Sequence, residues 1–172
     1  MMMKYIGVLA ALALAMPAAA SAADPNDAQI AHIAYTAGQI DVAAGELALK
    51  KSKNKDIRSF AQEMVRDHAA VNKQALALVT KLKVTPEDNA TSKALSADAA
   101  TKLKAYAALD GEAFDRAYIA NEIAFHKTVN GALSSTLIPA ARNPELKALL
   151  ETGLKVFTEH QAHAEHVAME VK

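Results

Sequence analysis

The chain has 172 residues, with 19 basic and 19 acidic side chains and no cysteine. The absence of cysteine excludes disulfides, a lipidated N-terminal cysteine and covalently attached haem. The charge is balanced and no predicted helix has a basic face, so we expect no nucleic-acid partner.

Residues 1–23 have the three parts of a secretory signal peptide. A cationic start ending at Lys4 precedes an apolar run of about a dozen residues and then a segment of small side chains. The apolar run is shorter than the roughly 20 residues that span a bilayer. We therefore predict cleavage near Ala22 or Ala23, a periplasmic or secreted mature protein, and no stable membrane insertion after cleavage.

Two long amphipathic helices are expected to open the mature chain. The first is predicted over 24–51, with Asp24 as its cap and Pro25 at the first helical position. The second is predicted from a cap at Asn54 to about Lys83. Apolar residues at helical spacing provide each helix with a face to bury.

The second half of the chain begins with a breaker-rich connection. It leads into a short crossover helix over 96–108, which is too small to have a core of its own. The third long helix is predicted from a cap at Asp110 to about Leu137, because Pro139 disfavours helical geometry at the residue before it. Asn143 is predicted to cap the fourth long helix.

The four long helices are predicted to form one domain over 24–172. The composition is rich in alanine, leucine, lysine and glutamate and has no alternating run of β-branched residues. Two short connections imply two antiparallel hairpins. We therefore predict an all-α fold: an up-down-up-down four-helix bundle of the ferritin-like kind, with the crossover helix between the second and third long helices.

Three of the six histidines and one acid lie on the apolar faces. His68, His126 and His160 fall on the seams of the second, third and fourth long helices. Asp41 interrupts the small-residue face of the first, where a buried charge needs a partner. In an alternating bundle both short turns lie at one end, and these residues then stand roughly 15–24 Å from that end. We expect the four to share one central layer.

Imidazole and carboxylate groups that converge from facing helices form metal sites in bundle proteins. We therefore hypothesise that Asp41 and the three seam histidines bind a transition-metal ion, either zinc, iron or copper. Asp67, Glu122 and Glu159 lie near these histidines in the sequence and are candidates as further ligands or as hydrogen-bond partners of the ligands. Ordinary polar residues, with each histidine bonded to a neighbouring acid or backbone group, would explain the same pattern.

The remaining histidines are interpreted as surface residues. A step of three residues turns an α-helix by about 300°, so His160, His163 and His166 cannot all face one ion. Glu159 and His163, four positions apart, are expected to form a solvated pair. His32 is also expected at the surface.

A non-catalytic role is favoured over an enzymatic one. The sequence contains neither a Gly-x-Ser-x-Gly turn nor a Gly-rich phosphate loop. Non-covalent haem between Met64 and a seam histidine stays open. Two other classes also stay open. One is an acid-responding stress or holding protein of the cell envelope, whose histidines change charge between about pH 5 and 8. The other is an interaction module that binds a protein partner or forms a homo-oligomer.

Several segments together carry a family pattern: Gly38–Val42, Gly45–Leu49, Phe60–His68 with Asn72, Phe114–Tyr118, His126 and Glu159–His160. They resemble the bacterial family called domain of unknown function 4142, over about Asp27 to Ala168. The resemblance implies an exported four-helix bundle of the ferritin-like superfamily. Asp41 stands where that family usually has glutamate. No glutamate stands three residues before a seam histidine, so the Glu-x-x-His pairs of di-iron proteins are missing and ferroxidase activity is not implied.

Overall fold

The computed structural model describes residues 24–171, which form helices and no strand. The predicted signal peptide, residues 1–23, lies outside the described residues. The all-α prediction is confirmed. The helical elements are α1 (Asp27–Lys51), α2 (Lys55–Leu82), α3 (Ala90–Ala107), α4 (Gly111–Ala132), the π-helix η1 (Leu133–Leu137), α5 (Ile138–Ala140) and α6 (Pro144–Glu170).

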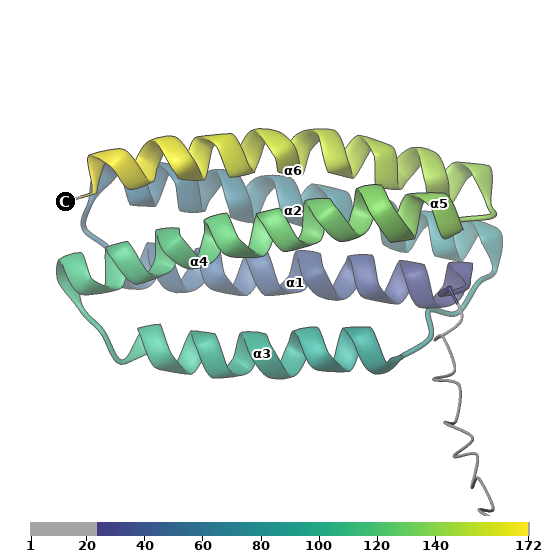
Figure 1. The fold of residues 1–172 in the computed structure, drawn as a ribbon, viewed down its shortest axis with the longest axis horizontal. Helices are drawn as coiled ribbons and strands as arrows, with labels where there is room; N and C mark the ends of the chain where they lie inside the picture. The colour runs from purple at the N-terminus through teal and green to yellow at the C-terminus, as the bar shows by residue number, and fades with distance from the viewer. Residues whose placement is uncertain (1–23, 172) are drawn as a thin grey trace, which may run out of the picture.

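Four helices form the bundle, and the fifth long helix lies outside it. α1 packs against α2 and α4, and α6 packs against α2 and α4, so these four enclose one core (Figure 1). α3 packs mainly on the outer side of α1. The predicted four-helix bundle with a crossover helix between the second and third long helices is confirmed.

The length of α3 sets the direction of the second half of the bundle. α3 has 18 residues and begins at the cap Asn89, whereas the crossover was expected over 96–108. At 1.5 Å per residue it returns the chain along most of the bundle. Successive helices therefore alternate in direction when α3 is counted, and α2 and α4 point the same way (Figure 1).

The two short turns consequently lie at opposite ends of the bundle, so the predicted up-down-up-down order of the four long helices, with both turns at one end, is wrong. Lys51, at the end of α1, forms an ion pair of 2.9 Å with Asp110, just before α4. Asp27, at the start of α1, accepts hydrogen bonds from the backbone N–H groups of Arg142 and Asn143 in the turn before α6. α1 and α4 are therefore antiparallel neighbours.

Asparagine side chains cap most of the helices. Asn54 and Asn143 cap α2 and α6, as predicted. The expected cap of α1 at Asp24 is wrong, because Asn26 takes this position. Its side chain accepts from the backbone N–H of Gln29, whose own side chain accepts from the backbone N–H of Asn26. This reciprocal pair satisfies two of the free N–H groups at the helix start.

The helical segment after α4 continues past the predicted end. We expected it to stop near Leu137, but Ile138 is helical and the helix reaches Ala140. The N–H of Ile138 donates to the carbonyl of Leu133, five residues earlier, which is the wider spacing of a π-helix. This wider turn comes directly before Pro139, which has no N–H and whose ring would crowd a regular α-turn.

The core consists of two apolar clusters with polar residues between them. One cluster lies toward the α1–α2 turn and contains the aromatic side chains of Phe60, Phe114 and Tyr118. The other lies toward the α5–α6 turn and contains Ile30 and Leu150. No helix in the described range has an apolar stretch long enough to cross a membrane.

Candidate metal centre

Three buried imidazoles meet in the middle of the bundle. His68 comes from α2, His126 from α4 and His160 from α6, and each is about 1% exposed. The ring centroids lie 5.2–5.6 Å apart. One nitrogen from each ring lies within 4.8 Å of the other two. Since a metal ion holds imidazole nitrogens at about 2 Å, small rotations of the rings would bring all three nitrogens to one ion.

One nitrogen of each ring faces an acceptor outside the cluster. His126 Nδ1 donates to the backbone carbonyl of Glu122 at 3.0 Å. His160 Nε2 donates to Asp67 Oδ2 at 3.1 Å. His68 Nδ1 lies 3.4 Å from Asp41 Oδ2. The acceptors of His126 and His160 hold these two imidazoles in one orientation and in one tautomer, whereas His68 Nδ1 makes no hydrogen bond within the described residues.

The opposite nitrogens have no partner. His68 Nε2, His126 Nε2 and His160 Nδ1 are buried and make no hydrogen bond within the described residues. Burial lowers the pKa of all three histidines, and that of His126 to about 4. The rings are therefore neutral at neutral pH, which is the form that binds metal ions. Three neutral imidazoles with unpaired nitrogens match the donor set of a transition-metal site.

Two buried carboxyl groups adjoin His126 on its inner side. Asp41 comes from α1 and Glu122 from α4, and both are nearly inaccessible to solvent. One oxygen of each lies within 4.8 Å of the other and of a His126 nitrogen. Burial raises the pKa of both groups, that of Glu122 to about 8, and the nearby Glu122 raises the pKa of Asp41 further. A proton or a cation is needed to hold the two carboxyl groups together.

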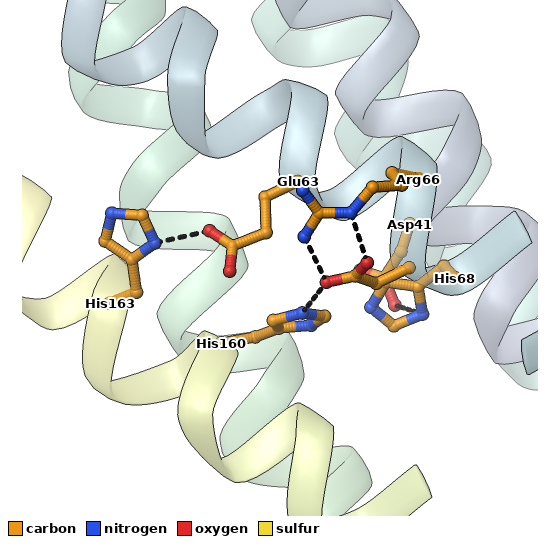
Figure 2. Close-up of polar contacts among 7 residues, drawn as sticks. Asp41, Glu63, Arg66, His68, His160 and His163 are labelled. Carbon is orange, nitrogen blue, oxygen red and sulfur yellow. Dashed lines mark hydrogen bonds and ion pairs between the residues drawn. The ribbon is translucent and has the colours of Figure 1, made fainter. Parts of the chain in front are cut away.

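Two further carboxylates adjoin His160 on the solvent side (Figure 2). Glu63 and Asp67, both on α2, form a third group with His160 within 4.8 Å. Both oxygens of Asp67 accept from the Arg66 guanidinium, at 2.6 and 2.8 Å. This contact lowers the pKa of Asp67. Glu63 accepts from His163 Nδ1 at 2.6 Å.

The family model described as "Domain of unknown function (DUF4142)" matches residues 12–167 of the chain. The chain belongs to this family. No curated protein matches it significantly. Among solved structures, one titled "CopM in the Cu(II)-bound form" is similar at a TM-score of 0.65 and 15% identity, and the alignment covers 86% of this chain and 99% of that one. The likeness to CopM shows a shared fold.

In this DUF4142 member the residues of the sequence hypothesis lie in two overlapping groups. The three seam histidines form one, and Asp41, which also adjoins His68, forms the other with Glu122 and His126. Glu122, expected to assist His126, is as buried as the histidines; its backbone carbonyl accepts the hydrogen bond from His126 Nδ1, and its carboxyl oxygen Oε2 lies 3.7 Å from the same nitrogen.

The solvent-side acids differ from the expectation in one respect. Asp67 bonds to His160, whereas Glu159 is exposed. The expected pair of Glu159 with His163 is wrong, because His163 bonds to Glu63 of α2. Glu63 could have been found from its position one helical turn before Asp67, which places both acids on one face of α2.

Two further histidines of this DUF4142 member lie outside the candidate metal centre. His32 was expected at the surface but is half-buried, and its Nδ1 has no partner within the described residues. His166 is exposed, as expected. Neither residue belongs to any of the three groups of ligand atoms found in the described part of the chain.

Proposed function

We propose that this protein binds one transition-metal ion between His68, His126 and His160. The observation that supports the proposal is the close approach of three buried rings, each of which has a buried nitrogen without a hydrogen-bond partner. An unpaired buried polar atom destabilises a fold, and one ion would pair all three at once. The acceptors on the outer nitrogens of His126 and His160 supply the orientation that metal-binding histidines need.

Imidazole ligands suit zinc, copper and iron. CopM, which has a similar fold, was solved in a Cu(II)-bound form, and this favours copper as the first ion to test. Asp41 and Glu122 stand next to His126 and are the nearest candidates for a further ligand. A cation that binds there would replace the proton that these two carboxyl groups hold.

Burial of the histidines favours metal binding over an acid response near neutral pH. The acid-response hypothesis relied on histidines that change charge between about pH 5 and 8. The pKa of buried His126 is lowered to about 4, and those of His68 and His160 are lowered too. The central rings are therefore neutral at neutral pH, and His126 stays neutral throughout that interval.

The test is a titration of the purified metal-free protein with Cu(II), Zn(II) and Fe(II) by calorimetry. We expect one strong site, lost when His68, His126 and His160 are replaced together by alanine. The matched control replaces the other three histidines, His32, His163 and His166, and should keep the site. Binding that survives the central triple substitution, or no binding by the wild type, would reject the proposal.

A second measurement guards against misfolding of the central triple variant. Electron paramagnetic resonance of Cu(II) bound to the wild type reports coupling to each ligand nitrogen. We expect coupling to three imidazole nitrogens, reduced to two in the single variant His160→Ala. A signal from oxygen ligands alone would contradict the histidine site.

We also propose that the protein works outside the cytoplasm after removal of residues 1–23. The support is the tripartite pattern of this segment. Expression of the full chain in a bacterium, followed by fractionation and N-terminal sequencing, tests it. A protein that keeps Met1 and stays in the cytoplasmic fraction would contradict this part of the proposal.

A further inference from the structure

A second internal feature lies between the histidines and the α5–α6 turn. A cavity of about 530 Å³, partly open to solvent, lies between α1, α2, α4, η1 and α6, and the beginning of α3 lines its outer side. Sites for small molecules have volumes of roughly 300–1,000 Å³. Protein interiors rarely leave voids larger than a water molecule, so this volume is a specific feature of the bundle.

Small side chains on facing helices create the cavity. Ala34 and Ala37 of α1, Ala75 of α2, Ala132 of α4 and Gly153 of α6 line it at positions where larger residues would fill it. Leucine and valine are the commonest of the other apolar lining residues, and the polar ones are a glutamine, two asparagines and three threonines. No described residue that lines the cavity is charged. An ionised ligand would find no counter-charge there, so the wall suits a neutral apolar molecule.

One buried polar group in the wall has no partner. Asn72 of α2 is 5% exposed, and its amide Nδ2 makes no hydrogen bond within the described residues. The Asn72 amide packs against Gly38 of α1, where a side chain would clash, because a Cβ at Gly38 would lie 2.3 Å from Asn72 Oδ1. The close approach of α1 therefore depends on this glycine. An unpaired N–H donor in an apolar wall calls for an acceptor on the ligand.

The cavity ends at the candidate metal centre. Phe157 lines the cavity and stacks on His68, with ring centroids 4.5 Å apart and planes inclined by 8°. Asn72 stands one helical turn after His68 on the same face of α2. Phe157 separates the polar layer from the apolar cavity, so the two sites are distinct and can be tested separately.

We propose that this cavity binds a neutral, apolar small molecule that carries one hydrogen-bond acceptor, such as a ketone or ester carbonyl, and that this acceptor receives the N–H of Asn72. The volume and the apolar wall select the body of the ligand, and the amide selects its single polar group. The proposal does not depend on metal binding.

The test uses two neutral fluorescent dyes in metal-free buffer. Prodan has one ketone, and phenylnaphthylamine has no carbonyl. We expect saturable, blue-shifted emission of Prodan with the wild type. Ala75→Leu fills the cavity and should abolish this emission, whereas Ala77→Leu, at an exposed position of the same helix, should keep it. Equal Prodan binding by Ala75→Leu and Ala77→Leu would overturn the cavity site.

The role of Asn72 has its own variant. Asn72→Leu keeps the branched shape and removes the donor. It should weaken Prodan binding roughly three- to tenfold, the range of one hydrogen bond, and leave phenylnaphthylamine binding unchanged. Equal weakening of both dyes, or of neither, would overturn the acceptor part of the proposal.

Two controls separate misfolding from loss of the site. Circular dichroism checks the helix content of each variant, and Ala132→Leu fills the cavity from α4 if Ala75→Leu does not fold. A folded cavity-filling variant should bind the metal ion as the wild type does. Loss of dye binding in a variant that keeps the wild-type helix content supports the cavity proposal, and dye binding that persists in both folded variants would reject it.

Discussion

Carboxyl groups flank the three histidines on two sides, and their surroundings shift the pKa values of the inner pair and the pKa of Asp67 in opposite directions. On the inner side, burial raises the pKa of Asp41 and Glu122, so the pair holds a proton at neutral pH. On the solvent side, the Arg66 guanidinium lowers the pKa of Asp67, so that this carboxylate is ionised. Burial decides the charge on one side and a neighbouring cation decides it on the other.

The difference indicates two roles for carboxyl groups around one cluster. The ionised Asp67 accepts a hydrogen bond from His160 and fixes the direction of its other nitrogen. The protonated inner pair stands beside His126 and can exchange its proton for a metal cation. We therefore expect substitutions on the solvent side to act through orientation and substitutions on the inner side to act through protonation.

The largest expected effect distinguishes Asp67 from a neighbouring acid. Asp67→Ala removes the acceptor that holds His160, and metal affinity should fall about 10- to 100-fold. Glu159→Ala, at an exposed position beside His160, should leave affinity unchanged. Calorimetric titration of both variants with the ion that the wild type binds gives the comparison. Equal affinities for the two variants would show that Asp67 does not position His160.

The contrast between Asp67 and Glu159 also shows how far the sequence could predict the site. Helical periodicity places His68, His126 and His160 on buried faces, because the apolar stripe of each helix points to the core. The choice between neighbouring acids depends on which helix packs alongside. Glu63 and His163 are 100 positions apart. Their contact follows from the packing of α2 against α6, which no local pattern specifies.

Fold class and helix faces were predictable, whereas helix direction and the cavity were not. The caps Asn54 and Asn143 act within one turn, so they can be read locally. The parallel course of α2 and α4 depends on how far α3 returns the chain, and this was underestimated because its start at Asn89 lies in a breaker-rich segment. The cavity arises where small residues such as Ala75 and Gly153 face one another across the bundle.

The next largest effect concerns the inner pair and the stability of the metal-free protein. Between its ordinary pKa near 4.5 and its folded pKa of about 8, Glu122 holds a proton that the unfolded chain has released. The free energy of unfolding therefore falls as pH rises through this range, by about 1 kcal/mol per pH unit for one proton. Glu122→Gln removes this contribution. The free energy of unfolding of the variant should therefore fall with pH less steeply than that of the wild type, by about 1 kcal/mol per pH unit.

Urea denaturation at pH 7 and pH 8 with a chelator present measures this difference. The window lies above the ordinary pKa of histidine, so the depressed pKa values of the central rings, whose effect on stability lies at lower pH, do not interfere. Glu151→Gln, at an exposed position of α6, is the control and should keep the wild-type slope. Equal slopes for the wild type and Glu122→Gln would mean that Glu122 is ionised in the folded protein.

The smallest expected effect tests the solvent side. Arg66→Ala removes the guanidinium that lowers the pKa of Asp67, so this pKa should rise toward its ordinary value. The bond from His160 to Asp67 remains and still favours the carboxylate, so Asp67 stays ionised at pH 7. Metal affinity should therefore stay within about threefold of the wild type, since exposed ion pairs contribute little. NMR titration of the Asp67 carboxyl carbon measures the pKa. A loss of affinity as large as that of Asp67→Ala would mean that Asp67 cannot orient His160 without Arg66.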